Sequence, residues 1–162
     1  MLIRLLFALL LLKVGVFHSE MMMSQQAGSG GQYEILERFQ DTRVFRSSSL
    51  AISVSKALSM GDTKAVICKV WEAEIARTDP EFSAIGIYYD LSLEQYVPGL
   101  GTFDPPSPTE QTRSAHKLAT YLWSNRVTPP ARNLTMIRNV DGTIIDPPKV
   151  VEVDPMKDCS VR

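Results

Sequence analysis

Hydrophobic residues recur at helical spacing in one stretch near the middle of the first half of the chain. Five of them fall on a single helical face: Leu50, Ala51, Val54, Ala57 and Leu58. Ser47, Ser48 and Ser49 come directly before these residues, and serine is a preferred N-cap residue because its hydroxyl accepts from a free backbone amide. Gly61 follows and can end a helix in the left-handed conformation. The pattern therefore predicts a helix between the serines and Gly61.

Apolar runs bounded by turn signals predict the strands of a sheet. The run from Lys64 to Ile75 is rich in β-branched residues and predicts a central strand that is covered on both faces. Further strands are predicted from Arg43 to Arg46 and from Phe82 to Tyr89. The mixed spacing between Tyr33 and Phe39 is compatible with a short helix or a short strand at one edge of the fold.

The second half of the chain begins with an irregular stretch and a capped helix. Residues from Asp90 to Pro106 combine glycine, proline and aromatic residues, which is typical of a long loop of the kind that often carries function. Ser107-Pro108-Thr109-Glu110 is a capping box with proline at the first helical position. It predicts a helix that ends before Pro129-Pro130.

A hairpin and one more strand complete the predicted elements. Leu134–Val140 and Thr143–Ile145 flank Asp141-Gly142, a dipeptide that type I′ hairpin turns favour. Val150–Val153 predicts a last short strand. The elements together predict an α+β single domain, in which two principal helices accompany a mixed, mainly antiparallel sheet.

Composition divides the chain into segments. Residues 1–19 resemble a signal peptide, residues 20–32 form a flexible linker rich in glycine, serine and glutamine, residues 33–155 form the α+β domain, and residues 156–162 form a polar tail. The domain is long enough to bury one hydrophobic core.

The first segment predicts secretion. Arg4 is followed by an apolar run from Leu5 to Leu12, and no acidic residue occurs before Glu20. Contact with a membrane is then expected only transiently, during export. The alternative is a cytoplasmic protein whose translation starts at one of the methionines Met21 to Met23. Asn133-Leu134-Thr135 is a glycosylation sequon, which is informative only if the chain passes through a glycosylating compartment.

The charge balance and the cysteine content bear on three features: nucleic-acid binding, metal sites and disulfides. The 17 basic and 18 acidic residues give a net charge of -1, so no single-sign field is expected to attract nucleic acid or an anionic membrane. The two cysteines and two histidines do not match zinc-site spacing, so no metal site is predicted. Cys68 lies in the predicted buried strand and Cys159 in the tail, which favours two inert thiols over a disulfide.

Side chains that can perform acid-base or nucleophilic chemistry are scattered along the sequence. His116 is predicted on the polar face of the capped helix, where solvation is the simplest interpretation and a role in a hydrolase is the remote one. Glu72 and Glu74 would point to the same face of the predicted strand, which indicates a solvent-exposed edge.

The order of these elements over residues 43–146 resembles the second half of mono-ADP-ribosyltransferase A subunits of the pertussis- and cholera-toxin type. In the resemblance Ser47-Ser48-Ser49 stands where that family has Ser-Thr-Ser, which implies a substrate-binding role for Ser47, Ser48 and Ser49. Glu110-Gln111-Thr112 matches the family's Glu-x-Glu, which implies a catalytic role for Glu110 and implies NAD as the cofactor.

The chain departs from the family's pattern in ways that bear on activity. No segment between Glu20 and Gln40 matches the first strand with its phosphate-binding arginine, and Thr112 replaces the second glutamate. That carboxylate stabilises the cationic sugar formed as nicotinamide leaves, so the resemblance implies a reduced or degenerate transferase. No residue of the chain by itself requires a cofactor, and NAD is expected only through the resemblance. A secreted, toxin- or effector-like domain that binds a host or cell-surface protein is the expectation. The alternative is a non-enzymatic interaction or structural module.

Overall fold

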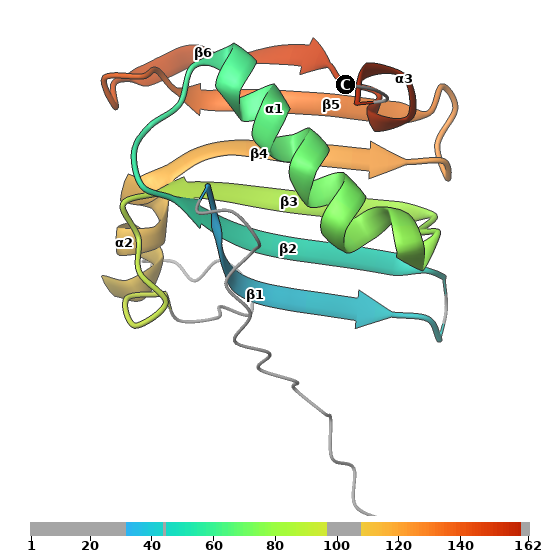
Figure 1. Cartoon of the computed structure of the whole chain (residues 1–162). Helices are drawn as coiled ribbons and strands as arrows, with labels where there is room; N and C mark the ends of the chain where they lie inside the picture. Colours follow the sequence, from blue (N-terminus) through green and yellow to red (C-terminus); the bar gives the residue numbers. More distant parts are fainter. Residues whose placement is uncertain (1–31, 44, 97–107, 160–162) are drawn as a thin grey trace, which may run out of the picture.

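The computed structural model describes residues 32–43, 45–96 and 108–159 as strands and helices of one sheet-based domain (Figure 1). In chain order the elements are β1 (Glu34–Asp41), β2 (Ser47–Val54), α1 (Met60–Val70), a π-helical turn η1 (Trp71–Ile75), a 3-10 turn η2 (Ala76–Thr78), β3 (Phe82–Tyr89), α2 (Pro108–His116), β4 (Lys117–Ser124), β5 (Ala131–Arg138), β6 (Ile144–Glu152) and α3 (Pro155–Asp158). The longer helices among the described residues are α1 and α2.

The strands form one six-stranded mixed sheet, whose order β1-β2-β3-β4-β5-β6 follows the sequence. β2 and β3 are parallel, and every other neighbouring pair is antiparallel. A parallel pair needs a crossover connection, which α1 supplies by passing over one face of the sheet (Figure 1). The predicted α+β class, with a mixed and mainly antiparallel sheet and two principal helices, is confirmed.

The hydrophobic core lies between α1 and the sheet. Residues on the α1 side of four adjacent strands stand in register across the sheet: Leu50, Ile85, Tyr121 and Leu134. The helical segment contributes Ile67, Val70 and Trp71, each almost fully buried. Trp71 packs against Tyr121 and Trp123, with ring centroids 6.5 and 5.1 Å away. This aromatic group anchors the C-terminal end of α1 to β4.

The prediction of a central strand from Lys64 to Ile75 was wrong, because this segment is helical. The Ser59 hydroxyl accepts from the backbone amide of Asp62 at 3.2 Å and caps the helix. Gly61 therefore lies in the first turn of α1 and does not end a preceding helix. The β-branched residues Val66, Ile67 and Val70 fall at helical spacing and are buried on one face, so packing outweighs their strand propensity.

The predicted helix after the serines was also wrong, because Ser47–Val54 is strand β2. Both faces of its second half are covered, by α1 on one side and by a smaller apolar cluster on the other. A strand that is covered on both faces has a continuous apolar sequence without alternation, so its pattern does not distinguish a strand from a helix. Arg43, Phe45 and Arg46 belong to the connection between β1 and β2 and not to the predicted short strand.

In the second half of the chain the predicted helix is too long. Helix α2 ends at His116, and β4 starts at Lys117 with Leu118 and Ala119 fully buried in the sheet. Ser107, the first residue of the predicted capping box, lies outside the described residues. The strand Phe82–Tyr89 is confirmed, and the segment around Tyr33–Phe39 takes the strand alternative as edge strand β1.

The predicted hairpin is confirmed as β5–β6, but its turn differs from type I′. The amide of Gly142 donates to the carbonyl of Asn139 at 2.9 Å, and Gly142 has a positive φ of 81° whereas Asp141 does not. This is a type I turn followed by a left-handed glycine. Strand β6 continues through Pro147 and Pro148 to Glu152, which an edge strand tolerates because one side of its backbone has no partner strand.

Cys68 and Cys159 form a disulfide, so the prediction of two separate thiols was wrong. Cys68 lies in α1 and Cys159 directly follows α3, with Cα atoms 5.1 Å apart and a sequence separation of 91. A helical Cys68 presents its sulfur beside α3, whereas a central strand would have enclosed it. Among the described residues, no helix is long and apolar enough to cross a membrane.

Candidate functional site

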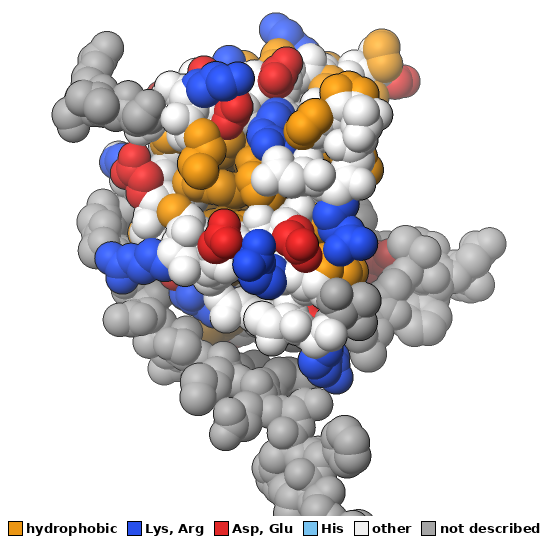
Figure 2. All heavy atoms as spheres, turned by 90° about the vertical axis from the view of Figure 1, so that its right-hand side faces the viewer, with side chains coloured by type: hydrophobic (Ala, Val, Ile, Leu, Met, Phe, Trp, Pro, Cys, Tyr) orange, Lys and Arg blue, Asp and Glu red, His pale blue; other side chains and the backbone are white. Residues whose placement is uncertain are grey.

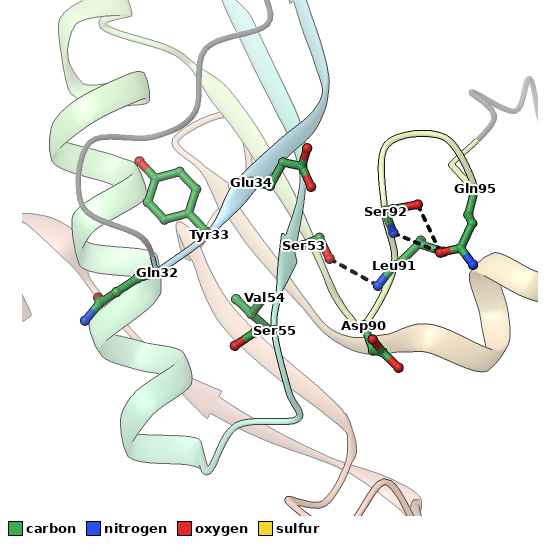
Figure 3. Close-up of a pocket in the computed structure, with 10 residues that line it drawn as sticks. All are labelled: Gln32, Tyr33, Glu34, Ser53, Val54, Ser55, Asp90, Leu91, Ser92 and Gln95. Carbon is green, nitrogen blue, oxygen red and sulfur yellow. Dashed lines mark hydrogen bonds between the residues drawn. The ribbon is translucent and has the colours of Figure 1, made fainter.

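A hollow of about 380 Å³ opens at one end of the sheet, where β1 begins and where β2 and β3 end (Figure 3). It is lined by three segments that are far apart in the sequence: Gln32, Tyr33 and Glu34; Ser53, Val54 and Ser55; and Asp90, Leu91, Ser92 and Gln95. The parallel pairing of β2 with β3 places Val54 beside Tyr89 and so brings the second and third segments together. β1 adds the first, because Glu34 pairs with Ser53.

The loop after β3 forms one wall of this hollow and is fixed in place by hydrogen bonds. The amide of Asp90 donates to the carbonyl of Val54 at 2.9 Å, and the amide of Leu91 donates to the hydroxyl of the buried Ser53 at 3.3 Å. Gln95 accepts from both the amide and the hydroxyl of Ser92, at 3.0 and 3.1 Å (Figure 3). Asp90 has a positive φ of 49°, a conformation that aspartate tolerates better than most residues. The wall therefore has a defined shape without a bound partner.

The lining of the hollow combines apolar surface with polar groups, two of which are carboxylates. Glu34 and Asp90 are exposed, and neither forms an ion pair with another residue in the described part of the chain. Figure 3 shows Tyr33 and Glu34 directed to opposite sides of β1. The Lys69 amine hydrogen bonds to the Gln32 side chain and lies at the border of the hollow. Chemically, the hollow offers carboxylates, hydroxyls and amides as hydrogen-bond partners for a cationic group.

A cluster of two tyrosines, Tyr88 and Tyr96, packs next to the loop that follows β3. The Tyr96 hydroxyl donates to the Glu37 carboxylate at 2.5 Å, and the Tyr88 and Tyr96 rings pack edge to face at 5.8 Å. Burial, followed by this hydrogen bond, raises the pKa of Tyr96 far above its ordinary value. The Arg113 guanidinium lies 5.8 Å from the Tyr96 ring and connects α2 to the same cluster.

The residues named by the resemblance lie apart. Ser48 faces α1 and is buried without a hydrogen-bond partner, whereas Ser49 points to the opposite face of β2. Ser47 pairs with Phe82 at the start of β3, and α2, which carries Glu110, lies at the other end of that strand (Figure 1). A strand the length of β3 separates these ends by about 23 Å. The structure does not bring Glu110 together with the serines.

The hollow is lined by neither Glu110 nor any of Ser47, Ser48 and Ser49. The resemblance also relied on a helix between the serines and Gly61 and on a strand at Lys64–Ile75. The structure has strand β2 (Ser47–Val54) and helix α1 (Met60–Val70) instead. NAD binding and transferase activity therefore remain predictions that rest on the resemblance alone.

The other singled-out side chains have structural contacts. The His116 Nδ1 atom lies 2.9 Å from the Tyr89 carbonyl oxygen, and its ring packs against the Tyr89 ring at 5.7 Å. Glu74 pairs with Arg38 of β1 at 2.5 Å. Glu72 and Glu74 lie in the helical turn η1, so they do not share the strand face that was predicted for them. Within the described ranges, no group of three His, Cys, Asp or Glu side chains is placed to hold a metal ion.

The end of the molecule opposite the hollow presents charges of both signs (Figure 2). Arg46 lies 3.3 Å from Asp79, and Arg126 lies 3.6 Å from Glu81. The Arg126 guanidinium also lies over the Phe45 ring, 4.7 Å from its centre. These cations are thus matched by nearby anions and by an aromatic ring.

Sequence reasoning did not find the hollow. It singled out the stretch from Asp90 to Pro106 as a loop of the functional kind, and Asp90, Leu91, Ser92 and Gln95 from that stretch do line the hollow. The rest of the lining carries no motif, because it depends on how three strands pair. Comparison of the chain with protein-family models, with curated proteins and with solved structures gave no match to any of them.

Proposed function

We propose that this chain is an exported, disulfide-stabilised domain that acts by binding another protein. The observation that carries the proposal is the bond between Cys68 and Cys159. Disulfides persist in oxidising compartments and at the cell exterior, and are rare in a reducing cytosol. The N-terminal pattern of Arg4 followed by an apolar run points to the same route.

The hollow is the contact surface that we propose for the partner. Its wall is held by backbone hydrogen bonds to Ser53 and Val54, so little ordering is needed when a partner binds. Its two carboxylates, on Glu34 and Asp90, are exposed and free of ion pairs with other described residues. A cationic peptide segment with Lys or Arg side chains is therefore the partner chemistry that complements it.

Removing both carboxylates is expected to weaken the binding of a basic peptide. We predict that Glu34→Gln with Asp90→Asn lowers the affinity for a fluorescein-labelled oligolysine peptide by about fivefold, because each exposed ion pair contributes less than about 1 kcal/mol. Fluorescence anisotropy titrations at low and high salt would measure this. The difference between wild type and variant should shrink at high salt, since salt screens exposed charges.

A matched control removes two exposed carboxylates elsewhere, through Glu72→Gln with Glu152→Gln. This variant has the same net charge as the first one, and its affinity for the peptide is expected to stay close to that of the wild type. Equal losses in the two variants would assign the effect to net charge and remove the hollow from the proposal.

A further inference from the structure

No helix or strand that the structure describes covers the face of β4, β5 and β6 that points away from α1 (Figure 1). Asn133 lies on this face in β5, since its neighbour Leu134 is fully buried against the core on the other side. Its side chain is exposed although β5 has strands on both sides. Across the sheet it stands opposite Leu122 of β4 and Glu152 of β6. No described element covers Asn133 here.

Asn133 is the first residue of Asn133-Leu134-Thr135, and the other asparagines, Asn125 and Asn139, are not followed by serine or threonine at the second position. Strand geometry places Asn133 and Thr135 on the same face, with the apolar Leu134 turned into the core. The acceptor amide of the sequon is therefore exposed, and a bulky group attached to it would point away from the core and would not disturb the fold.

We propose that Asn133 carries an N-linked glycan, which rests on the export in the proposed function. In the transfer step, the Asn133 side-chain nitrogen forms a bond to the anomeric carbon of an oligosaccharide held on a lipid diphosphate. The bond from that carbon to the diphosphate oxygen breaks, the lipid diphosphate leaves with the electron pair, and the amide nitrogen loses a proton. No oxidant or reductant takes part.

The glycan has a defined place on the molecule. It stands over the open face of β4 to β6, where Leu122 is half-buried and Val150 is 57% exposed beside Thr135. It is remote from the hollow, which is built from β1, β2 and the loop after β3. The glycan thus shields apolar surface on one part of the sheet and leaves the proposed contact surface free.

Expression of the full chain in a eukaryotic cell tests this, once with its own N-terminus and once behind a heterologous cleavable leader. Peptide mapping by mass spectrometry after treatment with peptide N-glycosidase reports glycan occupancy as conversion of Asn133 to aspartate. We expect a glycan on Asn133 in the protein expressed behind the heterologous leader and in its Thr135→Ser variant. We expect complete loss of the glycan in the Asn133→Gln and Thr135→Ala variants. Reading occupancy from peptides keeps the result independent of how well each variant folds.

The outcomes separate the two proposals. The glycan proposal is overturned if the protein with the heterologous leader is exported with its disulfide formed but with an unmodified Asn133. A different result is a glycan on the protein with the heterologous leader while the chain with only its own N-terminus stays in the cytosol. This result would support the glycan site and overturn export as part of the function.

Discussion

Replacing both Cys68 and Cys159 with serine is expected to lower the free energy of unfolding by about 4 kcal/mol. The disulfide closes a loop with a sequence separation of 91 residues, so its loss gives the unfolded chain many more conformations. It also frees α3 and the end of β6 from α1. Chemical denaturation followed by circular dichroism, on the wild type and on Cys68→Ser with Cys159→Ser, would measure the difference.

Reduction provides the control for this prediction. Adding a thiol reductant to the wild type should reproduce the lower stability, whereas adding it to the double serine variant should change nothing. A loss below about 1 kcal/mol in the double variant would show that the bond hardly constrains the unfolded chain, contrary to the chain-entropy estimate.

Trp71→Ala is expected to cost about 4 kcal/mol of unfolding free energy, in the middle of the range for buried aromatic residues. Trp71 is 3% exposed and fills the space between η1 and the Tyr121 and Trp123 rings of β4. Truncation leaves a cavity at the point where the helical segment is anchored to the sheet. Urea denaturation of the variant, monitored by circular dichroism, measures the cost.

Tyr121→Phe is the matched variant on the other side of that contact. It keeps the ring but removes the hydrogen bond from the Tyr121 hydroxyl to the Val153 carbonyl, which is 3.0 Å long. Its expected cost is about 1 kcal/mol, because the substitution leaves one buried acceptor without its donor. A smaller loss for Trp71→Ala than for Tyr121→Phe would contradict the packing of the helical segment on β4.

Several elements were predictable because local signals bound them clearly. Phe82–Tyr89 lies between Asp79-Pro80 and Asp90, and all of it is strand. The Asp141-Gly142 turn signal placed the β5–β6 hairpin correctly, although the turn needs only one left-handed residue.

The exchange of helix and strand between β2 and α1 has a common physical cause. Both segments are short apolar runs, and such runs show the same hydrophobicity whether a strand is covered on two faces or a helix packs on one. Ser59 and Asp62 carried a capping signal for α1, but the three serines before Leu50 carried a more conspicuous one. Only the pairing of Ser47–Val54 with both β1 and β3 decides between them.

The candidate site was harder to predict from the sequence than the fold was. Glu34, Ser53 and Asp90 come together through strand register, and no spacing rule links them. The disulfide was missed for a related reason, since the sequence pattern placed Cys68 in a buried strand, whereas it lies in α1 and is bonded to Cys159. The sequon at Asn133 was visible in the sequence, whereas its exposure on an open sheet face is a property of the fold.

The most direct test of an exported, disulfide-stabilised domain is a non-reducing peptide map of the chain expressed with its own N-terminus and recovered from the culture medium. We expect to find the protein in the medium, with the peptides containing Cys68 and Cys159 cross-linked to each other. Recovery of the chain only from the cytosol, with both cysteines available to an alkylating reagent, would contradict it.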